Sequence, residues 1–229
     1  MKLLSDGGTN YKQAKSNAKG VGYLSSILYL APHKNSGAGN VCAAASAGCA
    51  AACLYTAGRG KMSTVKASRI RKTKMFFDDR AGFIAQLKED VKSFIKKCNK
   101  LGKLPAVRLN GTSDLPWESW GIIEEFPEVQ FYDYTKILKR MLIFCKGGMP
   151  ANYHLTFSRS ETNEAKCLEV LRAGGNVTAV FASGRDKYQR FRVIDGDSHD
   201  LRFLDPSPRW VGLLPKGDAK RDDSGFVVR

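Results

Sequence analysis

Three cysteines gather in one short segment of the chain, VCAAASAGCAAACLYTAGRG at positions 41–60. Cys42, Cys49 and Cys53 have six and then three residues between them, nearly all small, so the backbone can close tightly around a bound metal. Thiolates are ligands for zinc and for iron–sulfur clusters. Structural zinc normally takes four protein ligands, whereas three ligands leave one coordination position open for chemistry. The sequence therefore predicts a three-cysteine metal site.

The sequence alone does not identify a fourth protein ligand for this site. Cys98, Cys145 and Cys167 stand alone at long separations, and His33 precedes the cysteine segment. Isolated free cysteines usually behave as small buried hydrophobes, so we expect the three to belong to the core. Any one of the four residues would turn the site into a structural zinc site.

The charge of the chain indicates the kind of partner. The 229 residues include 37 Lys and Arg against 22 Asp and Glu, a formal net charge of +15. Such a surplus is typical of proteins that bind polyanions, so nucleic acid or a nucleotide is the predicted partner. Lysines on solvated helix faces give the same count, and a host protein is the alternative partner.

The sequence lacks targeting and membrane-spanning segments, and this indicates the cellular location of the protein. It shows no signal peptide and no apolar run long enough for a membrane span, so we expect no membrane partner and a cytoplasmic location with reduced thiols. The hydrophobic content of 43% is ordinary for a globular protein.

Strand and helix patterns alternate along the chain. The helix expected at 79–100 has apolar residues at Phe83, Leu87, Val91 and Phe94 with charges between them. Strands are expected at 22–31, 104–110, 129–134, 153–157 and 177–182, and further helices at 63–74, 119–125 and 163–173. This alternation predicts an α/β fold, a βα-repeat domain built as a partial or complete barrel over residues 41–229. Residues 1–40 would form an N-terminal arm and the first strand region.

Polar side chains follow several of the expected strands. Parallel strands end at a common edge, so we expect these side chains to share one site with the cysteine segment. Asn110, Asp114 and His199 are the candidate catalytic residues, with Asp195 as an alternative nucleophile or base. The basic residues expected to hold an anionic substrate are Arg59, Arg69, Lys136 and Arg159.

The stretch at 192–206 is rich in acidic residues, among them Asp195, Asp197 and Asp205. It lacks the regular ligand spacing of a calcium loop, and Asp-Gly and Asp-Pro are strong turn formers. We therefore expect turns and ion pairs here.

Several motifs resemble those of a phage-encoded family designated only by a gene-product number. They are CAAASAGCAAACL, AGRG, RLNGTSDLPWE, FYDYTK, HLTFSRSE and VIDGDSHDLRFLDP, and the resemblance runs from about position 32 to 229. More distantly, the three-cysteine loop ahead of βα repeats is similar to radical SAM enzymes. That likeness implies a 4Fe-4S cluster on the three cysteines, with S-adenosylmethionine on the open iron. The residues it would place near S-adenosylmethionine are Asn110, Gly111, Ser113 and Ser158.

Three functions remain as hypotheses. The leading one is an iron–sulfur, radical-SAM-like phage enzyme that acts on a nucleic acid or nucleotide. The second is a non-enzymatic basic protein that binds nucleic acid or a host protein and holds structural zinc. The third is a metal-independent enzyme that modifies a base or nucleotide on the same barrel, using Asp114 or Asp195.

Overall fold

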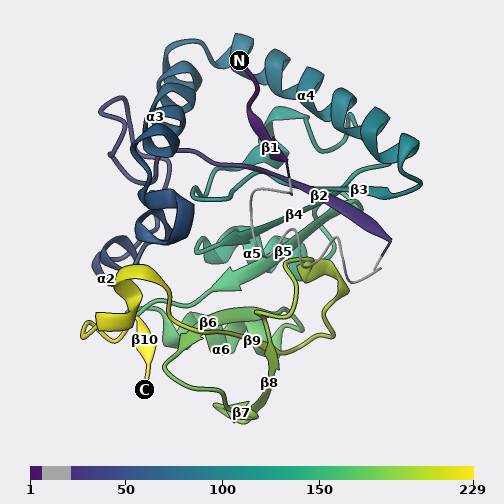
Figure 1. The fold of residues 1–229 in the computed structure, drawn as a ribbon. Coiled ribbons are helices and arrows are strands. Elements are labelled where there is room, and N and C mark those ends of the chain that lie inside the picture. The colour runs from purple at the N-terminus through teal and green to yellow at the C-terminus, as the bar shows by residue number, and fades with distance from the viewer. Residues whose placement is uncertain (7–21) are drawn as a thin grey trace.

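A ten-stranded sheet organises the part of the chain that the computed structural model describes, residues 1–6 and 22–229 (Figure 1). Its strands are β1 (Leu4–Asp6), β2 (Tyr23–Leu28), β3 (Leu104–Arg108), β4 (Gln130–Thr135), β5 (Tyr153–Ser158), β6 (Val177–Phe181), β7 (Lys187–Tyr188), β8 (Phe191–Asp195), β9 (Trp210–Leu213) and β10 (Val227–Val228). The α-helices are α2 (Ala47–Ala51), α3 (Ser63–Asp78), α4 (Arg80–Lys100), α5 (Leu138–Cys145) and α6 (Glu164–Arg172).

The strands follow the order β1-β2-β3-β4-β5-β6-β9-β8-β7, and β10 pairs with β6. From β2 to β8 all neighbours are parallel, while β1 and β7 add antiparallel edges. Consecutive strands from β2 to β6 lie side by side because a helix or a loop returns the chain each time to the same end of the sheet. The α/β class is confirmed, but the described strands form an open sheet, so a closed barrel is not what the structure has.

The two faces of the sheet are covered differently. Helices α3 to α6 contribute to one apolar core, which α4 enters with the stripe of Phe83, Leu87, Val91 and Phe94. Because side chains alternate along a strand, neighbours of the core-facing residues point to the other face. There Tyr132 joins a smaller cluster with Ala106 and Leu201, against which Tyr23 and Phe203 pack.

Most expected elements are present, with several corrections. Of the piece expected to be helical at 119–125, only the first two residues are helical, as the end of the 3₁₀ turn Trp117–Trp120, and the others form turns. Helix α5 and strands β1, β7, β9 and β10 were not expected, and the stretch at 192–206 contains most of β8. The expected N-terminal arm falls partly on residues 7–21, which lie outside the described residues; β1 and β2 belong to the main sheet. Within the described chain, no helix combines the length and apolar character that a membrane crossing requires.

Candidate functional site

The cysteine loop, residues 41–60, belongs to the segment between β2 and α3 and lies at the edge where the parallel strands end (Figure 1). It contains α2, which begins after Ser46 because the Ser46 hydroxyl accepts a hydrogen bond from the Cys49 N–H at 3.2 Å. Cys42 precedes α2, Cys49 lies within it, and Cys53 follows it. All three side chains are partly buried.

The three thiols lie within electrostatic reach of one another. Burial raises the pKa of Cys42 to about 12, and the nearby Cys53 and Cys49 add to that increase. Burial also raises the pKa of Cys53, again with a contribution from Cys49. In the described ranges, however, no three His, Cys, Asp or Glu side chains stand at metal-binding distances. The fold thus gathers the predicted ligands at one edge without bringing them to ligand spacing.

The loop after β3 forms the first anchor of the cysteine loop. Asp114 donates its backbone N–H to the Val41 carbonyl at 2.8 Å, and the Cys42 thiol donates to the Thr112 carbonyl at 3.4 Å. The Asp114 carboxylate accepts from Arg140 Nη1 at 2.9 Å and from the Lys136 N–H at 2.8 Å. Because both carboxylate oxygens are engaged, this geometry suits an anchor better than a free base.

Asn110 and Gly111 shape this same loop. Asn110 Oδ1 accepts hydrogen bonds from Ser113 Oγ at 2.8 Å and from Trp117 Nε1 at 3.0 Å. Gly111 donates its N–H to the Leu28 carbonyl at 3.0 Å, and a Cβ added there would lie 2.6 Å from that oxygen. Only glycine allows this approach, so the Asn110 side chain and the Gly111 backbone both serve the turn. A contact of these residues with S-adenosylmethionine stays a prediction.

A second anchor comes from the loop after β5. Glu161 Oε1 accepts a hydrogen bond from the Gly48 N–H at 2.8 Å, and Oε2 accepts from Ser46 Oγ at 2.7 Å. The carboxylate therefore caps the first turn of α2. Sequence reasoning did not assign Glu161 a role, because the two partners are separated by 113 residues or more.

A third anchor is the C-terminal segment, which lies beside α2 in Figure 1. Ala52 packs in a small apolar cluster with Ala219 and Val227, supported by Val180 and Phe226. The 3₁₀ turn that follows Cys53 also contacts the 3₁₀ turn Gly217–Arg221. The carboxyl end of the chain therefore covers the cysteine loop.

The predicted basic residues occupy different positions. Arg69 and Lys136 both act electrostatically on the Cys53 thiol, so the structure brings these two to the cysteine loop. The Lys136 ammonium donates a hydrogen bond to Ser158 Oγ at 2.6 Å, so the Ser158 hydroxyl already has a partner within the protein. Arg59 is exposed on the cysteine loop itself.

Arg159 is engaged in contacts within the protein. Its Nε donates to Glu164 at 2.5 Å, and its Nη1 donates to the carbonyls of Gly225 and Phe226 at 3.0 and 3.1 Å. The guanidinium thereby ties α6 to the C-terminal segment. Its predicted contact with substrate would have to compete with these bonds.

His199 and Asp195 lie in the region of β8 and the chain that follows it. His199 belongs to the segment that crosses the face of the sheet opposite the helices. There Arg202 is fully buried and donates a hydrogen bond from its guanidinium to the His199 carbonyl at 2.5 Å. Arg202 also lies 3.2 Å from Asp205, which confirms the expected ion pairing in this stretch. Asp195 ends β8, is exposed, and accepts from the Asp197 N–H at 2.8 Å.

The four residues considered as a fourth metal ligand lie in different parts of the fold. Cys98 and Cys145 stand at the carboxyl ends of α4 and α5, shortly before β3 and β5 begin, which is the opposite edge of the sheet. Cys167 is fully buried in the core. His33 lies at the base of the cysteine loop, where its carbonyl accepts from the Val41 N–H at 3.4 Å.

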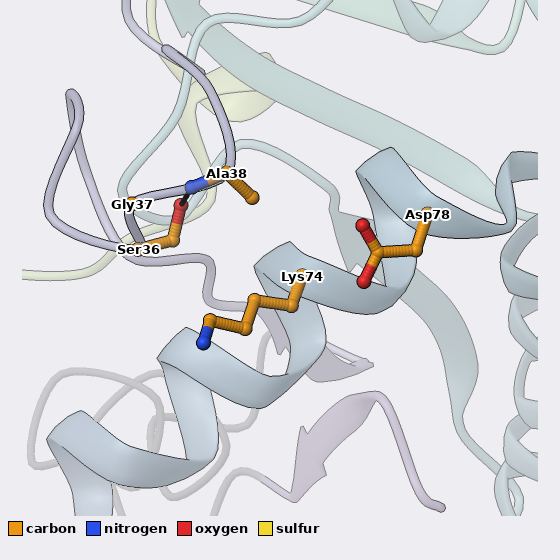
Figure 2. A pocket seen from close by; sticks show the side chains of 5 residues that line it. All are labelled: Ser36, Gly37, Ala38, Lys74 and Asp78. Carbon is orange, nitrogen blue, oxygen red and sulfur yellow. Dashed lines mark hydrogen bonds between the residues drawn. The ribbon is translucent and has the colours of Figure 1, made fainter.

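A cavity of about 260 Å³ lies beside α3, as Figure 2 shows. The residues that line it are Ser36, Gly37, Ala38, Lys74 and Asp78. Ser36 Oγ accepts a hydrogen bond from the Ala38 N–H at 3.2 Å. None of the three cysteines lines this cavity, so it is separate from the candidate site.

Comparison with known families decides the relationship. A protein-family model described as Gene product 88 matches residues 2–229. The chain belongs to the Gene product 88 family. This membership confirms the resemblance to a phage gene-product family. No match to the chain is found among curated proteins or among solved structures. The likeness to radical SAM enzymes therefore stays a prediction.

Proposed function

We propose that the protein is an iron–sulfur enzyme of the radical SAM type that acts on a nucleic acid or nucleotide. The observation that carries the proposal is the position of Cys42, Cys49 and Cys53. They follow the first parallel strand, at the edge where the other parallel strands end, and their thiols act on one another. Ligand-binding groups gather at this edge in open α/β sheets.

The donor set fits an iron–sulfur cluster. Three thiols are soft ligands of the kind that such clusters use, and a set of three leaves one iron open. Radical SAM enzymes usually have three and two residues between their cysteines, against six and three here; α2 takes up part of the longer spacing. We take the open run of parallel strands from β2 to β9 as a partial βα barrel.

The chain's own residues would position the reactants. Cys42, Cys49 and Cys53 would hold the cluster, whose chemistry when bound would be the one-electron reductive cleavage of S-adenosylmethionine. Arg69 and Lys136, both close enough to act on Cys53, would hold an anionic substrate there. The three anchors around the loop hold the cysteines at this edge of the sheet, and the thiols would have to move closer together to bind a cluster.

Metal analysis tests this proposal. Protein purified without oxygen should be brown and contain iron and sulfide, and replacing Cys42, Cys49 or Cys53 by Ala should remove both. Cys145→Ala is the matched control because Cys145 is also partly buried but lies at the opposite edge. A Cys49→Ala protein with unchanged iron content would overturn the proposal.

One observation favours a second candidate, a nucleic-acid-binding protein with structural zinc. His33 lies at the base of the cysteine loop and could complete a site of three cysteines and one histidine. This candidate requires colourless protein with one zinc per chain, loss of zinc in His33→Asn, and unfolding on chelation. Iron and sulfide without zinc would exclude it.

A further inference from the structure

Arg69 is a buried cation that pairs with no acidic side chain of the described residues. Its side chain extends from α3, and the residue is 9% exposed. Among the described residues, neither Nε nor Nη1 of its guanidinium has a hydrogen-bond partner. The groups that act most on its charge are Tyr29, Cys53 and Tyr55, none of which is a carboxylate. A buried charge with no partner is costly, so this arrangement calls for a ligand that brings the opposite charge.

Two tyrosines fix the position of this cation. The Arg69 Cζ atom lies 4.7 Å from the ring centre of Tyr29 and 5.6 Å from that of Tyr55. Tyr29 follows β2, and Tyr55 lies in the 3₁₀ turn just after Cys53. Cation–π contacts stabilise the charge without using the N–H groups, which lie in the plane of the guanidinium. Those N–H groups suit an oxyanion with at least two oxygens.

Other cations surround the same place. Lys66 Nζ lies 5.4 Å from the centre of the Tyr55 ring, and Lys136 acts with Arg69 on the Cys53 thiol. Several positive groups around one guanidinium favour an anion of more than one charge, which is a property of phosphate rather than of a carboxylate.

We propose that Arg69, Tyr29 and Tyr55 form a phosphate-binding site that holds a phosphate group of the substrate beside Cys53. The identity of that substrate as a nucleotide or nucleic acid rests on the proposed function. The binding itself needs no cluster, because every group involved is a side chain of the protein.

Calorimetric titration of the metal-free protein with thymidine 5′-monophosphate tests the site. We expect Arg69→Gln to weaken binding about ten- to a hundredfold, the loss expected for hydrogen bonds to a charged group. Arg69→Lys keeps the charge but not the planar fork, so it should bind less tightly than wild type. Arg71→Gln is the matched control, because Arg71 is exposed on the same helix and its replacement removes the same charge. It should bind like wild type.

Several results would overturn the site: no binding of the nucleotide to wild type, equal weakening in Arg69→Gln and Arg71→Gln, or equal binding of thymidine without its phosphate. Methionine binding that depends on Arg69 while nucleotide binding does not would assign the guanidinium to a carboxylate and also overturn it. If Arg69→Gln does not fold, the comparison of Arg69→Lys with wild type decides. Nucleotide binding through Arg69 in a protein that never takes up iron would leave this site standing and remove the cluster proposal.

Discussion

Glu161 holds the first turn of α2, because its Oε1 accepts a hydrogen bond from the Gly48 N–H at 2.8 Å. Gly48 lies 113 positions earlier in the chain. The other carboxylate oxygen of Glu161 accepts from the Ser46 hydroxyl, which itself caps the helix. The position of Cys49 within α2 therefore depends on the loop after β5. A site of this construction is sensitive to residues that never touch a ligand.

Removing the Glu161 carboxylate should loosen the cysteine loop. We expect Glu161→Ala to lower the free energy of unfolding by about 1 kcal/mol, the usual cost of a lost helix cap. The iron content after anaerobic purification should fall with it. Urea denaturation and iron analysis measure the two effects. Glu169→Ala, at an exposed position of α6, should change neither; an iron content equal to wild type in Glu161→Ala would contradict the anchor.

A methyl group at Gly48 should displace α2. An added Cβ would lie 2.7 Å from Glu161 Oε2 and would also meet Ser224 Oγ, so α2 or these two side chains must move and the hydrogen bonds of Glu161 to α2 would be disturbed. We expect Gly48→Ala to lower the free energy of unfolding by about 1–3 kcal/mol, the usual cost of adding a methyl group to a packed site. Amide hydrogen exchange in α2 should become faster. Gly184→Ala is the control because nothing lies within 4 Å of an added Cβ there. Equal free energies of unfolding for Gly48→Ala and Gly184→Ala would contradict this prediction, because the groups around Gly48 would then accommodate the methyl group without loss of stability.

The Asp114 carboxylate should matter for stability. It pairs with Arg140 at 2.9 Å, and both side chains are nearly buried. We expect Asp114→Asn to lower the free energy of unfolding by about 1.5–3 kcal/mol, the range for hydrogen bonds to charged groups. The exposed pair of Asp218 and Arg221 provides the control, and Asp218→Asn should cost less than about 1 kcal/mol. Full stability with complete loss of activity in Asp114→Asn would instead support its predicted catalytic role.

Stability should depend on pH through Asp133. Burial raises the pKa of this carboxyl to about 7, although hydrogen bonds from Asn110 and Tyr153 lower it. The folded pKa lies above the unfolded one, so the contribution to stability is complete below about pH 4 and is lost as the pH rises through 7. Relative to Asp133→Asn, wild type should lose at most about 1.4 kcal/mol per pH unit in that window. A difference that stays flat between pH 4 and 8 in urea denaturation would contradict this.

Local patterns in the sequence identify some elements and miss others. The helix at α4 is predictable because its apolar residues recur at helical spacing and Gly102, with φ 60°, ends it. Helix α5 has only eight residues, and in so short an apolar run the spacing does not distinguish a helix from a strand. Strand β8 was hidden by the turn-forming Asp195, Gly196 and Asp197 at its end.

The sequence by itself determined that three cysteines share one small-residue loop, that strands and helices alternate, and that the chain carries a large positive charge. Only the tertiary structure decided which side chains hold that loop and which face it. Asp114 and Glu161 became anchors, and Arg159 became tied to the C-terminal segment. Arg69 was left buried, with no hydrogen-bond partner for its Nε and Nη1 among the described residues. Hydrogen bonding and burial between residues far apart in the chain leave no periodic pattern, so they emerge only when the sheet brings the strand ends together.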